Sequence, residues 1–141
     1  MRVAFFSTKS YDKESFSHYL PDHTHEFTFL EPKLDQNTVA LAEGLDAICS
    51  FVNDHLDEKT LSILSEMRVK NIVLRCAGYN QVDLKKASEL GLNICRVPAY
   101  SPEAVAEQDL ALLMTLSRKT HKAYNRVREN NYSIEGLTGF N

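Results

Sequence analysis

Several residue types are scarce in this sequence. Tryptophan is absent, and the 141 residues include only three cysteines, Cys49, Cys76 and Cys95, with no C-x-x-C pair. An odd number of widely spaced cysteines does not make a disulfide framework, and neither their spacing nor a nearby histidine pair favours a zinc site. We therefore expect reduced thiols, a cytoplasmic location and no bound metal.

Positive charge and long apolar runs are scarce as well. The formal net charge is −3, whereas nucleic-acid-binding domains carry an excess of basic residues. No apolar run approaches the roughly 20 residues that cross a bilayer, and the N-terminus starts with a strand pattern rather than a signal peptide. We therefore expect neither a nucleic acid nor a membrane as a partner.

Glycine is also infrequent, with five residues in the chain. They are Gly44, Gly78, Gly91, Gly136 and Gly139. None of them forms a G-x-G-x-x-G sequence, the turn by which dinucleotide-binding domains hold a pyrophosphate. The phosphate-binding part of a dinucleotide site is therefore absent from this chain.

Short apolar runs alternate with helical patterns along the first hundred residues. The predicted strands are residues 3–7, 26–30, 47–52, 71–74 and 93–97, and the predicted helices are residues 12–20, 37–43, 58–67 and 84–90. Asp57 is the expected N-cap of the third helix, and Gly91 follows the fourth. Strands that alternate with such helices favour an α/β fold with a five-stranded parallel sheet and helices on both faces.

The last predicted element is a long helix from Pro102 to about Asn130. Pro102 suits the first helical position, and Ser101 before it is a candidate N-cap. Apolar side chains occur almost all round the first half of this helix: Ala104, Val105, Leu110, Ala111, Leu113 and Met114. A helix that is apolar on every side is usually covered, so we expect another domain or another subunit against it.

The loop after the fourth predicted strand is a candidate anion site. Residues 74–83 pass from the strand through Gly78 into a helix that Asp83 opens. A turn at the carboxyl end of a strand can present free backbone N–H groups to a small anion. The alternative is an ordinary strand–helix loop in which the glycine only eases the bend.

Three sequence motifs carry a resemblance to a known family. They are R-C-A-G-Y-N at residues 75–80, R-V-P-A-Y-S-P-E-A-V-A-E at residues 96–107 and E-G-L-T-G-F at residues 135–140. With them, the whole chain resembles the D-isomer-specific 2-hydroxyacid dehydrogenases, and within that family the fermentative D-lactate dehydrogenases.

The resemblance implies a domain organisation. Residues 1–101 would be a flavodoxin-like substrate domain, residues 102–130 an interdomain helix that also forms a homodimer, and residues 131–141 the start of a linker into an NAD-binding Rossmann domain. The chain is then an N-terminal piece of an enzyme that reduces pyruvate to D-lactate with NADH. The family's catalytic Arg, Glu and His would lie beyond Asn141, so we expect no catalytic residue here and no activity from the isolated chain.

The resemblance also assigns binding roles to residues that are present. The backbone N–H groups of Ala77 and Gly78 would bind the substrate carboxylate, and Phe51 would line the pocket for the substrate's side chain. Tyr100 would donate a hydrogen bond to substrate, unless it is only a structural aromatic at a strand end. Val105 would contact the nicotinamide of NAD. Arg75, beside the loop, is expected to be structural.

Three alternatives stay open, and one of them is a regulatory, non-catalytic relative that keeps the fold as a sensor. A sister dehydrogenase for a larger D-2-hydroxy acid would share these motifs. A flavodoxin-like binding or signalling module would share the fold, but a receiver needs clustered acids after the first strand and a flavodoxin needs a glycine-bearing phosphate loop there. The sequence at that position is Phe6-Ser7-Thr8-Lys9, which satisfies neither.

Overall fold

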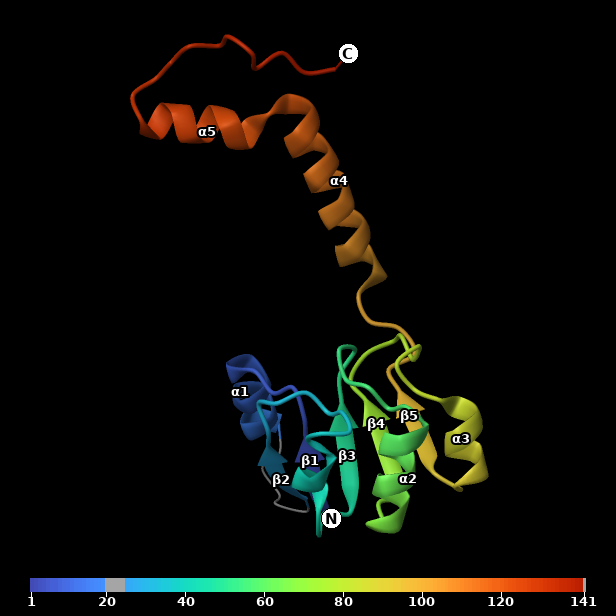
Figure 1. The fold of residues 1–141 in the computed structure, drawn as a ribbon. Helices are drawn as coiled ribbons and strands as arrows, with labels where there is room; N and C mark the ends of the chain where they lie inside the picture. The colour runs from blue at the N-terminus through green and yellow to red at the C-terminus, as the bar shows by residue number, and fades with distance from the viewer. Residues whose placement is uncertain (20–24, 141) are drawn as a thin grey trace. The chain divides into compact units, whose positions relative to one another are not determined.

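The chain folds into two compact units, residues 1–98 and 99–141. The computed structural model describes residues 1–19 and 25–140 (Figure 1). The first unit contains the whole sheet, and the second contains the helices that follow it.

The first unit is built on a five-stranded parallel sheet (Figure 1). Its strands are β1 (Arg2–Phe5), β2 (Glu26–Phe29), β3 (Ala47–Ser50), β4 (Asn71–Leu74) and β5 (Asn93–Arg96), in the order β2-β1-β3-β4-β5. All four pairings are parallel, which confirms the predicted α/β fold with a flavodoxin-like sheet. β1 and β3 end two residues earlier than predicted, so Phe6, Ser7, Phe51 and Val52 belong to the loops at the carboxyl edge.

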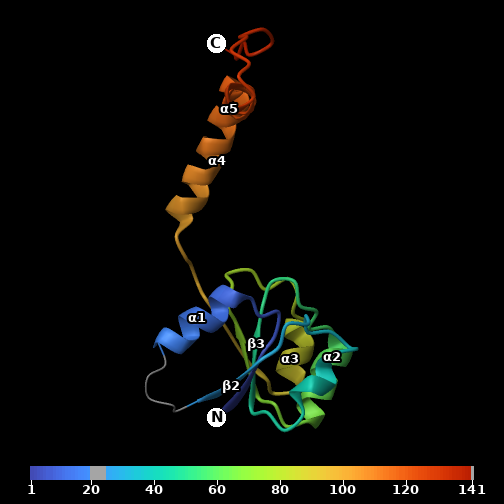
Figure 2. The ribbon, with the colours of Figure 1, turned by 90° about the vertical axis from the view of Figure 1, so that its left-hand side faces the viewer.

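Helices cover both faces of this sheet, as predicted. Helix α1 (Ser10–Tyr19) lies on one face, and α2 (Glu58–Glu66) and α3 (Leu84–Glu89) lie on the other (Figure 2). The helix predicted at residues 37–43 is wrong in type, because η1 (Val39–Ala42) is a single 3₁₀ turn. The last residue predicted for the first helix, Leu20, lies outside the described residues.

Side-chain caps begin α2 and α3. The carboxylate of Asp57 accepts a hydrogen bond from the backbone N–H of Thr60, and that of Asp83 accepts one from Lys86. Both bonds satisfy amides that have no partner within the first turn of a helix. Gly91 follows α3 in the left-handed region, with φ of 66°, which confirms its predicted place after the helix.

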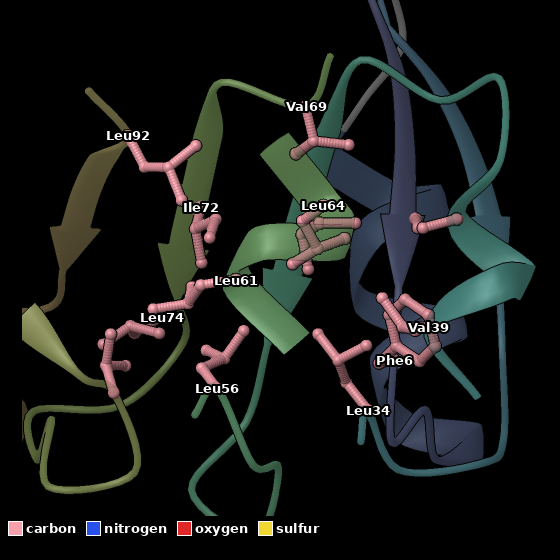
Figure 3. Close-up of a cluster of buried hydrophobic side chains, with 14 of the residues drawn as sticks. Phe6, Leu34, Val39, Leu56, Leu61, Leu64, Val69, Ile72, Leu74 and Leu92 are labelled. Carbon is pink, nitrogen blue, oxygen red and sulfur yellow. The ribbon is translucent and has the colours of Figure 1, made fainter. Parts of the chain in front are cut away.

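The main core lies between the sheet and the α2–α3 layer (Figure 3). Leu61 and Leu64 of α2 are fully buried there, against Ile72 and Leu74 of β4. On the opposite face of the sheet, under α1, the packing is aromatic. Phe5 meets Phe16 of α1 edge to face, with 4.8 Å between the ring centroids, and Phe27 and Phe29 of β2 complete an aromatic cluster.

The second unit departs from its prediction. The long helix is present as α4 (Pro102–Arg118), but the expectation of one unbroken helix to about residue 130 is wrong. Lys119 adopts the left-handed conformation, with φ of 54°, and a separate helix α5 (Thr120–Arg128) follows. Ser101 precedes α4 as expected but makes no side-chain cap bond.

Two cations within the second unit hold the segment that follows α5. The guanidinium of Arg126 donates to the carbonyl oxygens of Ser133 and Glu135, at 3.0 and 2.6 Å. The ammonium of Lys119 donates to the carbonyl of Gly136 at 3.2 Å. The described residues of α4 and α5 include no buried side chain, so these polar contacts, rather than a core, organise this part of the chain.

Candidate functional site

The loops after β3 and β4 meet at the carboxyl edge of the sheet. Ser50 and Leu74 pair as the last residues of the two strands, and the backbone N–H of Arg75 donates to the carbonyl of Ser50 at 3.0 Å. Phe51 follows one strand and Ala77 and Gly78 follow the other. In open parallel sheets, ligands bind at this edge, outside the carboxyl ends of the strands. The sheet therefore brings three of the predicted site residues onto neighbouring loops.

A buried carboxylate fixes the loop that carries Phe51. Asp54 is fully buried and accepts hydrogen bonds from the hydroxyl groups of Ser7 and Ser50, at 2.6 and 2.8 Å. It also accepts from the backbone N–H groups of Leu34, at 2.9 Å, and Phe51, at 2.6 Å. A buried carboxylate is tolerated only when donors surround it, so these four bonds bind three loops into one rigid edge.

Arg75 fixes the ring of Phe51. Its guanidinium lies 4.4 Å from the centroid of the Phe51 ring and 4.6 Å from that of Phe5. It donates to the carbonyl oxygens of Phe6 and Ser7, at 2.8 and 2.7 Å, and stands 3.5 Å from the Asp12 carboxylate. The side chains of this ion pair are about one-tenth exposed, so water screens it little. The expected structural role of Arg75 thus includes stacking on a predicted pocket residue.

A short parallel bridge joins the two loops further from the strands. The backbone N–H of Leu56 donates to the carbonyl of Gln81 at 2.9 Å, and that of Asp83 donates to the carbonyl of Leu56 at 3.0 Å. Leu56 is fully buried and Val82 nearly so. The loop at residues 75–83 is therefore held at both ends against the loop at residues 51–57.

Ala77 and Gly78 keep unpaired amides in the middle of this loop. Within residues 1–19 and 25–140, neither backbone N–H donates to an acceptor. Gly78 is exposed and Ala77 is partly exposed, so both amides lie in a loop that solvent reaches. Gly78 does not adopt a positive φ, and a Cβ built on it would meet nothing within 4 Å. Neither the backbone nor the packing requires glycine here, while two free donors suit a carboxylate.

Tyr100 and Val105 belong to the second unit. Tyr100 precedes α4 and is 58% exposed, and Val105, in the first turns of α4, is also 58% exposed. Neither side chain makes a hydrogen bond, ion pair or ring contact with the described residues. Their roles toward substrate and nicotinamide stay predictions.

Two polar residues of the first unit were not singled out from the sequence. Asp54 organises the edge, and Arg96 at the end of β5 donates from Nη1 to the carbonyl of Ala77 at 3.2 Å. A single acidic residue in a turn has no distinctive pattern. An arginine at a strand end gives no sign of which carbonyl it reaches, so only the folded chain identifies either residue.

The described residues contain neither a cluster of metal ligands nor a pyrophosphate-binding turn. In the ranges 1–19 and 25–140, no three His, Cys, Asp or Glu side chains gather closely enough to hold a metal ion. No described helix has the length and apolarity needed to cross a bilayer. None of the five glycines has the spacing of a pyrophosphate-binding turn.

Comparison with known proteins identifies relatives of the whole chain. The model of the D-isomer specific 2-hydroxyacid dehydrogenase catalytic domain matches residues 3–132. A 2-hydroxyacid dehydrogenase homolog of Haemophilus influenzae is 50% identical over 141 residues, which are 100% of this chain and 43% of that protein. The D-lactate dehydrogenase of Escherichia coli is 48% identical over 140 residues, covering 99% of this chain and 43% of the enzyme.

Solved structures of related proteins also superpose on the chain. The apo-structure of the Escherichia coli D-lactate dehydrogenase superposes with a TM-score of 0.89 at 48% identity, covering 99% of this chain and 44% of that one. The pyruvate reductase of Chlamydomonas reinhardtii superposes with a TM-score of 0.86 at 41% identity, covering 100% and 42%. The chain thus spans less than half the length of these relatives.

The environment of the cysteines at this edge can be tested by alkylation. Burial raises the pKa of the Cys49 thiol to about 11, although the nearby Arg75 guanidinium acts in the opposite direction. Because the folded thiol stays protonated, we expect Cys49 to resist iodoacetamide from about pH 8 to about pH 10, whereas exposed Cys95 is alkylated. Mass spectrometry of peptides locates the label. Cys95→Ser should remove the fast-labelled site, and rapid labelling of Cys49 in the folded chain would contradict its buried position.

Proposed function

The chain belongs to the D-isomer specific 2-hydroxyacid dehydrogenase family, and on this premise we propose that it is the substrate-recognition part of an NAD-dependent D-lactate dehydrogenase. The complete enzyme would reduce pyruvate to D-lactate with NADH in the cytoplasm, a location that the three free thiols favour. The length of the relatives supports a further segment that holds NAD and the reactive groups.

One observation carries the proposal. The amides of Ala77 and Gly78 are unpaired at the carboxyl end of β4, beside the loop that places Phe51. A 2-keto acid presents a carboxylate and, on the other side of its carbonyl, a side chain. Two main-chain donors match the carboxylate, and an aromatic ring on the neighbouring loop would leave room for a methyl group. Pyruvate has both features and is the smallest acid that does.

This division of tasks predicts what the chain does alone. It would bind and orient the acid but transfer neither the hydride nor the proton, because those steps need the nicotinamide and the family's Arg, Glu and His. In this proposal Tyr100 donates a hydrogen bond to the substrate and Val105 contacts the nicotinamide. The isolated chain is therefore expected to have no dehydrogenase activity.

A hybrid enzyme tests the proposal directly. Residues 1–141 are joined in place of the matching 43% of the Escherichia coli D-lactate dehydrogenase. NADH oxidation with pyruvate, and chiral analysis that finds D-lactate, support the proposal. A folded hybrid that binds NADH but reduces no 2-keto acid contradicts it and favours a non-catalytic relative.

In that hybrid, Gly78→Val tests the loop at residues 75–83, the anion loop, as the site of the substrate carboxylate. We expect the KM for pyruvate to rise at least about ten-fold, because the added side chain stands where the carboxylate approaches. The fold should tolerate the change, since a Cβ at this position meets nothing within 4 Å. Gly78→Ala should have a smaller effect, and Ala40→Val in exposed η1 serves as the control. An unchanged KM in Gly78→Val would overturn the carboxylate site.

Phe51→Ala tests substrate size. Removing the ring should favour bulkier acids, so we expect kcat/KM for 2-ketoisocaproate relative to pyruvate to rise by about ten-fold or more. Phe51→Leu, which keeps most of the volume, should change this ratio less. If the wild-type hybrid already prefers the bulkier acid, the substrate is a larger D-2-hydroxy acid. If the ratio is the same in all three proteins, Phe51 does not line the pocket.

Helix α4 is proposed as a dimer interface. Its exposed apolar side chains are Val105, Leu110, Leu112, Leu113, Met114 and Leu116, each more than half exposed. A helix with exposed apolar side chains on several sides usually contacts another protein surface. We expect sedimentation at micromolar concentration to give a dimer, and Leu113→Lys with Leu116→Lys to weaken it, whereas the charge reversal Lys122→Glu on α5 should not. A compact wild-type monomer would exclude this interface.

A further inference from the structure

Gly78 is the most permissive residue of the anion loop, yet both of its peptide groups are tied down. The carbonyl of Ala77 accepts a hydrogen bond from Nη1 of Arg96 at 3.2 Å. The carbonyl of Gly78 accepts one from the thiol of Cys76 at 3.2 Å. Glycine loses more conformational freedom on folding than any other residue. A loop that must present its amides in one orientation therefore benefits from such anchors.

The anchors also determine where the amides point. The carbonyl of Cys76 accepts from the backbone N–H of Val97, at 3.3 Å, and that of Ala77 accepts from Arg96. Both donors lie at the end of β5, on one side of β4, while β3 lies on the other side. In a trans peptide the N–H points opposite to the C=O. The amides of Ala77 and Gly78 are therefore turned away from β5, toward the side of β3 and the loop of Phe51.

We propose that Arg96 and Cys76 are positioning residues of this anion site, which hold the peptides of Gly78 so that its amide is available to a substrate carboxylate. The inference rests on the proposed function and deepens it. Neither side chain needs to touch the substrate. Arg96 acts through the carbonyl of Ala77, which shares a peptide with the Gly78 N–H. Cys76 acts through the carbonyl of Gly78, on the following peptide, and so restricts rotation about the Gly78 backbone.

The surroundings of both side chains suit this role. Arg96 Nη1 also donates to the carbonyls of Val97 and Pro98, at 3.4 and 3.2 Å, and its guanidinium lies 5.5 Å from the centroid of the Tyr79 ring. The thiol of Cys76 is buried and accepts from the side-chain amide of Gln81 at 3.4 Å. Each anchor is thus held by several contacts.

Loss of an anchor would affect binding more than a missing contact usually does. An Ala77–Gly78 peptide that is no longer held can rotate, which replaces the Gly78 N–H by the Ala77 carbonyl oxygen. That oxygen repels a carboxylate, so the rotated conformer does not bind the substrate. The apparent affinity then falls with the fraction of loops in the competent conformation.

Paired substitutions in the hybrid enzyme test the proposal. Arg96→Met and Cys76→Ala each remove the side-chain donor of one anchor. Arg96→Lys and Cys76→Ser each keep a hydrogen-bond donor at the same position. We expect the KM for pyruvate and the inhibition constant of oxamate to rise by about ten-fold in the first two variants, with kcat within about two-fold of wild type. The Lys and Ser variants should recover most of the affinity. Thermal unfolding of each variant identifies a loss of fold.

Salt separates anchoring from simple attraction by the arginine charge. A long-range attraction is screened between roughly 0.05 and 0.5 M ionic strength, whereas a rotated peptide is not. The proposal requires the ratio of KM values, Arg96→Met over wild type, to persist at high salt. It is overturned if that ratio disappears at high salt and Cys76→Ala binds normally, or if folded variants lose kcat with KM unchanged.

Crystal structures of the chain and of Arg96→Met decide the anchoring without any activity. We expect the Ala77 carbonyl on Arg96 in the wild type and a rotated or doubly occupied Ala77–Gly78 peptide in the variant. An identical peptide in both would overturn the inference while leaving the proposed function intact. The inference is also overturned if the wild-type hybrid is active and the Arg96 and Cys76 variants have the same KM as the wild type. An inactive wild-type hybrid would count against the proposed function alone.

Discussion

The carboxyl edge of this sheet depends on one buried carboxylate, that of Asp54. Its four hydrogen bonds reach the loop after β1 through Ser7, the segment before η1 through Leu34, and the end of β3 through Ser50 and Phe51. Such a group is costly to bury unless each oxygen is satisfied, and here each oxygen accepts two bonds. The loops it joins therefore cannot move independently. Arg75 adds a second set of constraints. Its guanidinium stacks on the rings of Phe5 and Phe51 and donates hydrogen bonds to the carbonyl oxygens of Phe6 and Ser7.

Under the proposed function, this edge of the first unit would carry substrate recognition and not the chemical step. The loops after β3 and β4 provide an aromatic ring and two unpaired amides, groups that would select and orient a small acid. None of these groups transfers a proton or a hydride. The family to which the chain belongs, and the greater length of its relatives, account for this division, because the remaining groups can come from another part of a longer chain. Recognition by main-chain donors would make the site sensitive to peptide orientation, which is where we propose that Arg96 and Cys76 contribute.

The sequence predicted the fold well where local signals were strong. The alternation of apolar strands with capped helices gave the parallel sheet, and Asp57, Asp83 and Gly91 marked helix ends correctly. It failed where the deciding contacts were distant. Residues 37–43 form only a 3₁₀ turn, and lysine at position 119 gives no local sign that α4 ends there. Of the site residues, Ala77, Gly78 and Phe51 lie on loops at one edge of the sheet, and the binding roles of all five, Tyr100 and Val105 included, stay predictions.

The sequence by itself determined the class of fold, the family resemblance, and the loop in which free amides would be found, because strand periodicity, capping residues and a glycine turn act over a few neighbouring positions. Only the tertiary structure decided which groups hold that loop. Arg96 lies 19 residues from the carbonyl it binds, and Asp54 lies 47 residues from Ser7. Such contacts exist only once parallel strands have paired in register, so they follow from the packing of the whole sheet and not from any local pattern.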